Sequence, residues 1–240
     1  MNEPLVDASD FSIGRVLSLS FGVLTRNLPA FLFLAVAVHV AAFLASMALI
    51  VIAAKTSPFV AVLANLFQSL ATSLLTAMIA YGTYQELRGN RASLGQVVGR
   101  GIALVIPIFF VGLLVAIIIG IGFALVFVPG IFFATILWVA IPAAVVERPG
   151  IFASLGRSSD LTKGSRWRIF GLAVVIYVPM YVVITLLTPL EQDGQLLVIV
   201  PTVLYGLLSL FAAVAAAVSY FELRRIKEGV GVGDLAAVFD

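Results

Sequence analysis

Long apolar stretches, each near the length of a membrane-crossing helix, alternate along the chain with short segments that hold almost all of its charge. A helix needs about 20 predominantly apolar residues to cross the roughly 30 Å of hydrocarbon in a bilayer. The pattern therefore predicts six spans, which cover about residues 28–54, 58–84, 101–128, 131–147, 169–190 and 196–220.

The third and fourth spans share one uncharged stretch, 101–146, which is about twice the length of a single span. Pro129 and Gly130 form a dipeptide that is typical of a turn, and they divide this stretch into a tight helical hairpin. Backbone groups in lipid have to be satisfied within helices or a closed barrel, and these runs lack the alternation of barrel strands. The sequence therefore predicts an all-α, polytopic membrane protein.

The residues before the first span form an amphipathic pattern of their own. Between residues 11 and 27, apolar side chains share one face of a helix, while Arg15 and Arg26 lie on the other. This pattern favours a helix at the headgroup level, and packing on the bundle is the alternative. The chain then divides into a cytoplasmic and interfacial helix at 1–27, a transmembrane domain at 28–222 and a cytoplasmic tail at 223–240.

Composition agrees with this interpretation, because 62% of the residues are hydrophobic, 11% are charged, and the mean hydropathy is +1.18. Soluble domains contain about 25% charged residues, so a soluble globular protein is excluded. The chain has no cysteine, which excludes disulfides and thiol chemistry. Among the 14 Lys and Arg residues, Lys55 alone lies between predicted spans on the side opposite to the others. The positive-inside rule therefore predicts cytoplasmic termini.

A short motif recurs before each of the three predicted hairpins. Its copies are Ser12-Ile13-Gly14-Arg15, Ser93-Leu94-Gly95-Gln96 and Ser154-Leu155-Gly156-Arg157. The hairpins also end alike, at Glu86-Leu87-Arg88, Glu147-Arg148 and Glu222-Leu223-Arg224. The register predicts one unit, a cytoplasmic segment plus two spans, used three times. Chance similarity between common residues is the alternative.

Candidate catalytic chemistry is sparse. No ionisable residue lies in the middle of a predicted span except His39, for which a packing role is favoured over proton transfer. Sets typical of a metal hydrolase, a phosphate-binding loop or a serine nucleophile elbow are missing from the sequence. We therefore expect neither an enzyme nor a cofactor or metal, with a membrane-embedded lipid enzyme as the least favoured alternative.

Two stripes of related side chains lie at helical spacing inside the spans. The second span carries a polar stripe, which could line a hydrophilic path together with His39 or, as we favour, bond neighbouring helices. Its members are Asn65, Gln68, Ser69, Thr72, Ser73 and Thr76. The third span carries small residues that predict a helix-packing ridge. These are Gly112, Ala116, Gly120 and Ala124.

The most distinctive text is residues 154–171 (SLGRSSDLTKGSRWRIFG), preceded by 142–147 and by Pro-Gly-Ile at 129–131. Over about 129–175 it resembles a bacterial family of six-span inner-membrane proteins. That family includes the membrane domain of some glycerophosphodiester phosphodiesterases and related uncharacterised proteins. The resemblance implies a bacterial inner-membrane location and a lipid-related setting. It does not imply hydrolysis, because the catalytic domain of those enzymes is absent from this chain.

A basic loop within that segment is the strongest binding candidate. Its residues are Arg157, Lys163, Arg166, Trp167 and Arg168. Cations and tryptophan at this level predict contact with anionic phospholipid, and ordinary positive-inside anchoring is the alternative. A membrane-protein partner or a second copy of the chain are further candidates, whereas a net charge of +2 argues against nucleic acid. A small transporter or channel along the polar stripe is the alternative function.

Overall fold

The computed structural model of the protein describes residues 11–52, 58–187 and 195–229. All regular secondary structure in these ranges is helical. The helices are α1 (Ile13–Ile52), α2 (Pro58–Leu87), α3 (Leu94–Leu125), α4 (Phe127–Ile136), α5 (Ala140–Val146), α6 (Ile151–Thr162), α7 (Arg166–Leu187) and α8 (Gln195–Glu228).

Six helical segments are long and apolar enough to cross a membrane, which confirms the predicted all-α membrane class. Five of them belong to α1, α2, α3, α7 and α8. The remaining segment, Phe127–Val146, consists of α4 and α5 with a turn at residues 137–139 between them.

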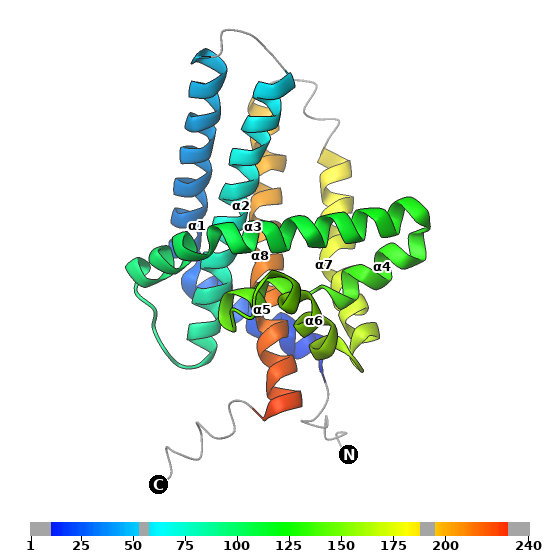
Figure 1. Cartoon of the computed structure of the whole chain (residues 1–240). Helices are drawn as coiled ribbons and strands as arrows, with labels where there is room; N and C mark the ends of the chain where they lie inside the picture. The colour runs from blue at the N-terminus through cyan, green and yellow to red at the C-terminus, as the bar shows by residue number, and fades with distance from the viewer. Residues whose placement is uncertain (1–10, 53–57, 188–194, 230–240) are drawn as a thin grey trace.

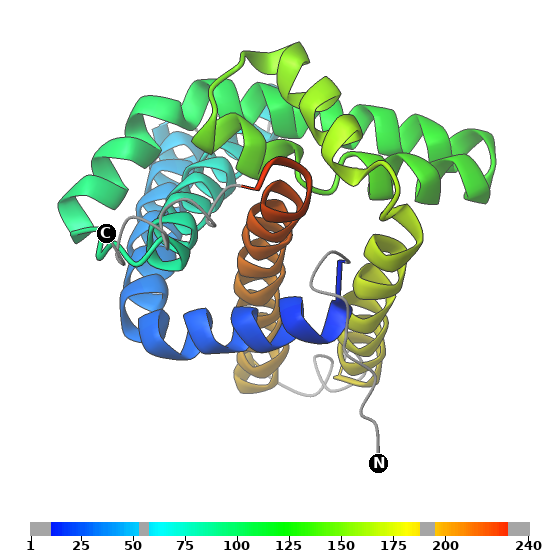
Figure 2. The same ribbon diagram turned by 90° about the horizontal axis from the view of Figure 1, so that it is seen from below.

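Three of the long helices stand beside a fourth, α8. Figures 1 and 2 show α2, α7 and most of α1 placed about α8, which runs through the middle of the molecule. The middle of α8 contributes apolar side chains to the core, and Val214, Ala215 and Val218 are fully buried. The start of α1, the ends of α2 and α8, and α6 all lie at one end of the molecule (Figure 1), which we call the polar end.

The middle hairpin, α3 and α4, runs across the standing helices instead of beside them (Figures 1 and 2). The two helices were expected as spans parallel to the rest. A close crossing of α3 over α2 accounts for part of this arrangement. At Gly101 an added Cβ would lie 2.5 Å from Met78 Cγ, so α3 approaches α2 at a position where a side chain would not fit. The buried face of α3 then continues through Leu104, Ile108 and Val111.

The hairpin itself is confirmed, but its turn is not at Pro129 and Gly130. Val126 is extended (φ −160°, ψ 149°) and separates α3 from α4. Pro129 lies in the first turn of α4, where a missing N–H leaves no helical hydrogen bond unmade. Gly130 permits close packing, since a Cβ added at Gly122 would lie 2.8 Å from Gly130 Cα.

The predicted small-residue ridge does not pack on another helix of this chain. A Cβ added at Gly112 or Gly120 would meet no atom within 4 Å, and Ala116 and Ala124 are exposed. This prediction was wrong in the described part of the chain, because α3 turns its Gly101 and Gly122 face inward instead.

Residues 13–27 are continuous with the first long helix. Pro29 lies inside α1, and the helix changes direction along its length (Figure 2) because proline removes a backbone donor and clashes with the preceding turn. Val16, Ser20 and Val23 are fully buried, and Val16 and Val23 belong to the main core. The packing alternative is therefore confirmed for this face of the amphipathic segment.

The Gly122–Gly130 contact gives a matched test of the α3–α4 hairpin. Gly122→Ala should lower the free energy of unfolding by about 1–3 kcal/mol, because the added Cβ meets backbone atoms that cannot move aside. Gly120→Ala, where the space is open, should be neutral or stabilising by up to about 1 kcal/mol. Unfolding of the purified protein by a denaturing detergent measures both. Equal effects of the two substitutions would contradict this packing.

Candidate functional site

The three glutamates that end the predicted hairpins each pair with an arginine at the polar end. Arg26 Nε lies 2.6 Å from Glu86 Oε1, and Arg157 Nε lies 2.7 Å from Glu147 Oε2. Arg15 Nε lies 3.3 Å from Glu222 Oε2. The sequence placed these carboxylates at the ends of spans, but it did not predict their partners.

Two of the three pairs use the last residue of the repeated motif. Arg157, in the third motif, pairs with Glu147 at the end of the second hairpin. Arg15, in the first motif, pairs with Glu222 at the end of the third hairpin. Each motif arginine therefore binds the glutamate that ends the preceding hairpin, where the third hairpin is taken to precede the first. This agreement supports a true three-unit repeat.

The second motif departs from this pattern, because it ends in Gln96. The Gln96 side chain accepts a hydrogen bond from Ser93 N (2.9 Å), and Gln96 N donates to Ser93 Oγ (3.3 Å). This capping box fixes the start of α3. It leaves Glu86, at the end of the first hairpin, to be bound by Arg26 on α1 instead.

Glu147 is at the centre of a polar cluster of five side chains. Besides Arg157, it lies 3.5 Å from Arg224 Nε, and it accepts a hydrogen bond of 2.6 Å from the Tyr220 hydroxyl. Glu228 joins the cluster through Arg157 and, at 2.8 Å, through Arg224. The hydrogen bond to Glu147 raises the pKa of Arg157. Two carboxylates and two guanidinium groups thus balance each other where α5, α6 and α8 meet.

Glu222 is the most buried charged group of this end, with 2% of its side chain exposed. Its Oε2 faces both Arg15 and, at 3.0 Å, Arg225, whereas its Oε1 has no hydrogen-bond partner in the described part of the chain. A carboxylate in such a place requires compensating cations. The ion pair between Arg15 and Glu222 therefore holds the beginning of α1 against the end of α8.

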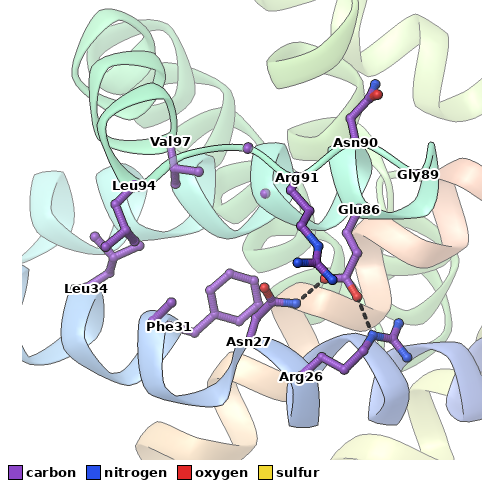
Figure 3. Close-up of a pocket in the computed structure, with 13 residues that line it drawn as sticks. Arg26, Asn27, Phe31, Leu34, Glu86, Gly89, Asn90, Arg91, Leu94 and Val97 are labelled. Atoms are coloured by element: carbon purple, nitrogen blue, oxygen red, sulfur yellow. Dashed lines mark hydrogen bonds and ion pairs between the residues drawn. The ribbon is translucent and has the colours of Figure 1, made fainter.

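A cavity of about 720 Å³ lies between α1, the end of α2 and the beginning of α3 (Figure 3). Its inner wall is apolar and contains Phe31, Leu34 and Val97, which are 4–5% exposed. Its rim is polar and contains the exposed Asn90 and Arg91. The cavity is therefore amphipathic, with a buried apolar side and an accessible polar side.

Glu86 is bound within this cavity by two donors of α1. Arg26 Nε and Asn27 Nδ2 each donate to one of its carboxylate oxygens (Figure 3). Arg91 points toward the same carboxylate in Figure 3, but no ion pair of Arg91 occurs among the described residues. The charge of Glu86 is thus compensated by Arg26, and Arg91 adds a cation that has no ion-pair partner among the described residues. Sequence reasoning missed this site, and Gln96 in place of an arginine was the signal that could have found it.

The predicted basic loop divides into two groups. Arg157 faces inward into the Glu147 cluster, so its predicted headgroup contact is not supported. Lys163, Trp167 and Arg168 are exposed, and 86% of Trp167 is accessible. The Arg166 guanidinium lies 5.3 Å from the centre of the Phe132 ring, which connects the start of α7 to α4.

The polar stripe of α2 makes local contacts. The hydroxyl groups of Thr72, Ser73 and Thr76 donate to carbonyls one turn earlier in their own helix. Asn65 and Ser69 are exposed, Gln68 is half-buried, and none of the stripe lines the cavity at the polar end. These hydroxyl bonds do not connect α2 to a neighbouring helix, so the favoured interpretation is not supported for them.

His39 is exposed on α1, and its Nδ1 lies 2.9 Å from the carbonyl oxygen of Ala35. His39 was expected to be a hydrogen-bonded packing residue, and its hydrogen bond is to its own helix at an exposed position. In the ranges that the structure covers, no three His, Cys, Asp or Glu side chains come together to hold a metal ion.

Comparison of the chain with protein-family models, with curated proteins and with solved structures gave no match. The resemblance over about 129–175 stays a prediction.

A double-mutant cycle tests the central pair of the polar cluster. Glu147→Gln and Arg157→Gln should show a coupling energy of about 1–3 kcal/mol, between typical exposed and buried pairs, because both side chains are about a quarter exposed. Glu147→Gln with Lys163→Gln should show coupling near zero. Unfolding in detergent measures each variant. Equal coupling in the two cycles would contradict a specific pair.

Proposed function

We propose that the chain is a multi-pass membrane protein that contacts anionic phospholipid headgroups through the basic surface of its polar end. The observation that carries this proposal is the start of α7, where Trp167 is 86% exposed and the neighbouring Lys163 and Arg168 are also exposed. Tryptophan prefers the membrane interface, and each nearby cation gains about 1 kcal/mol from anionic lipid.

The distribution of ion pairs supports this surface over the other basic residues. Arg15, Arg26, Arg157 and Arg224 are each bound to a glutamate, which compensates much of their charge, whereas Lys163 beside Trp167 is exposed. Transport along α2 has less support, because the hydroxyls of its polar stripe bond to their own helix. Contact with headgroups requires no catalytic residues and agrees with the chemistry that the sequence provides.

The orientation belongs to the same proposal. The basic residues gather at the end where α1 begins and α8 ends, and the positive-inside rule assigns that end to the cytoplasm. The resemblance to a bacterial inner-membrane family supports the cytoplasmic membrane of a bacterium as the location. A partner membrane protein or a second copy of the chain would meet the same face.

Lipid contact is tested by native mass spectrometry of the purified protein with phosphatidylglycerol or phosphatidylcholine. Arg166→Gln with Arg168→Gln should weaken phosphatidylglycerol binding at this surface about fivefold for each cation removed, because each loses roughly 1 kcal/mol of attraction. Arg148→Gln, a matched exposed arginine outside the loop, should leave binding unchanged. Unchanged phosphatidylglycerol binding in the double variant, or equal retention of both lipids by the parent protein, would contradict the proposal.

Orientation is tested with a reporter that is fluorescent or enzymatically active on one side of the membrane only. Fused after Asp240 of the full chain, it should report a cytoplasmic C-terminus, because an even number of crossings returns the chain to its starting side. Activity on the opposite side would exclude this arrangement.

A further inference from the structure

We propose that the cavity between α1, α2 and α3 is a binding site for one anionic phospholipid. In this site Arg91 contacts the headgroup phosphate, and the wall of Phe31, Leu34 and Val97 contacts the beginning of an acyl chain. The inference deepens the proposed function and rests on it for the membrane setting, but it concerns a different surface from the start of α7.

Size and lining fit an amphipathic ligand. The volume of about 720 Å³ is within the 300–1,000 Å³ range that is common for small-molecule sites. A free phosphate or a sugar phosphate would leave the buried apolar wall without a partner. A fatty acyl chain alone would leave the polar rim without one. A phospholipid near its phosphate and glycerol region satisfies both sides.

The charges of the cavity favour an anion. Glu86 would repel a phosphate if its carboxylate were free, but Arg26 and Asn27 each donate to it. Arg91 at the rim has no ion-pair partner in the described ranges and points into the cavity in Figure 3. A guanidinium group can bind phosphate through two parallel hydrogen bonds. The exposed side-chain amide of Asn90 adds a neutral donor at the same rim.

The repeat explains why the cavity occurs at this position. In the first and third units the motif arginine, Arg15 or Arg157, binds the glutamate of the preceding unit. In the second unit Gln96 folds back onto Ser93, and no side chain of α3 reaches Glu86 in the described contacts. The cavity lies between Glu86 and the start of α3. An arginine in the second motif would form the third glutamate–arginine pair at this position. Of the three places where a hairpin glutamate meets the motif of the next unit, two are thus filled by an arginine and one contains the cavity.

The surface of α1 offers a continuation for the acyl chain. Ala30 and Leu34 line the cavity, and Ala37 and Ala41 follow on the same face of the helix at a spacing of three and four residues. Both alanines are exposed and small. An acyl chain that enters over Leu34 can therefore continue along α1, away from the polar end.

The experiment is native mass spectrometry of the full chain with phosphatidylglycerol added at increasing concentration. Arg91→Gln should weaken the tightest lipid adduct about fivefold to tenfold, because it removes the phosphate contact. Ala30→Phe should also weaken it, by filling the cavity. The matched controls are Arg148→Gln, which removes an exposed arginine elsewhere, and Val36→Phe, which adds the same ring on an exposed position of α1. Both controls should leave the adduct intact.

A second arm separates this site from the start of α7. In the Arg166→Gln and Arg168→Gln background, a single tight adduct should persist and should still be lost with Arg91→Gln. Persistence of that adduct in both Arg91→Gln and Ala30→Phe would overturn the cavity site while leaving the α7 contact standing. A third arm adds inorganic phosphate. If phosphate binds in an Arg91-dependent manner and lipid does not, the lipid assignment is wrong.

Discussion

Carboxylates at the ends of very apolar helices have to be compensated, and the fold of the polar end follows from that requirement. Glu222 is almost fully buried and is held by Arg15 and Arg225, while Glu147 is held by Arg157 and Arg224. Two of these contacts, Arg15 with Glu222 and Arg224 with Glu147, join segments that are far apart in the sequence. The contacts together bring the beginning of α1 onto the end of α8, and α6 onto the end of α5. A buried pair of this kind gives little net stability by itself, but loss of one partner is costly, so it selects one arrangement of the helices.

The arginine–glutamate pairs also explain the position of the cavity. Two motif arginines form ion pairs with glutamates of neighbouring units. Gln96 in the second motif instead accepts a hydrogen bond from Ser93 at the start of its own helix. The cavity with Arg91 at its rim lies at that third position. A repeated sequence can thus form ion pairs between its units at two positions and keep a binding cavity at the third, because Gln96 stands where the other two motifs have arginine.

The sequence predicted the helical class, the six apolar segments and the middle hairpin, because these depend on hydrophobic length, which is local. It misplaced the turn of the hairpin, since a Pro-Gly dipeptide fits the first turn of α4 as well as a loop. It also assigned the inner face of α3 to Gly112 and Gly120, although Gly101 and Gly122 make the close contacts. Small residues at helical spacing do not indicate which of two faces meets a neighbour. The ion pairs were beyond prediction because they join residues up to about 200 positions apart, such as Arg15 and Glu222.

The most direct test of this account asks whether the pair between Arg15 and Glu222 holds α1 on α8. The chain contains no cysteine, and the rings of Phe21 and Phe211 lie 4.6 Å apart across the same contact. A Phe21→Cys and Phe211→Cys variant, treated in native membranes with a short bifunctional thiol reagent, should therefore cross-link within one chain. Adding Arg15→Gln should reduce the yield several-fold, and adding Lys163→Gln should not. A yield that Arg15→Gln leaves unchanged would contradict the central role of the arginine–glutamate pairs.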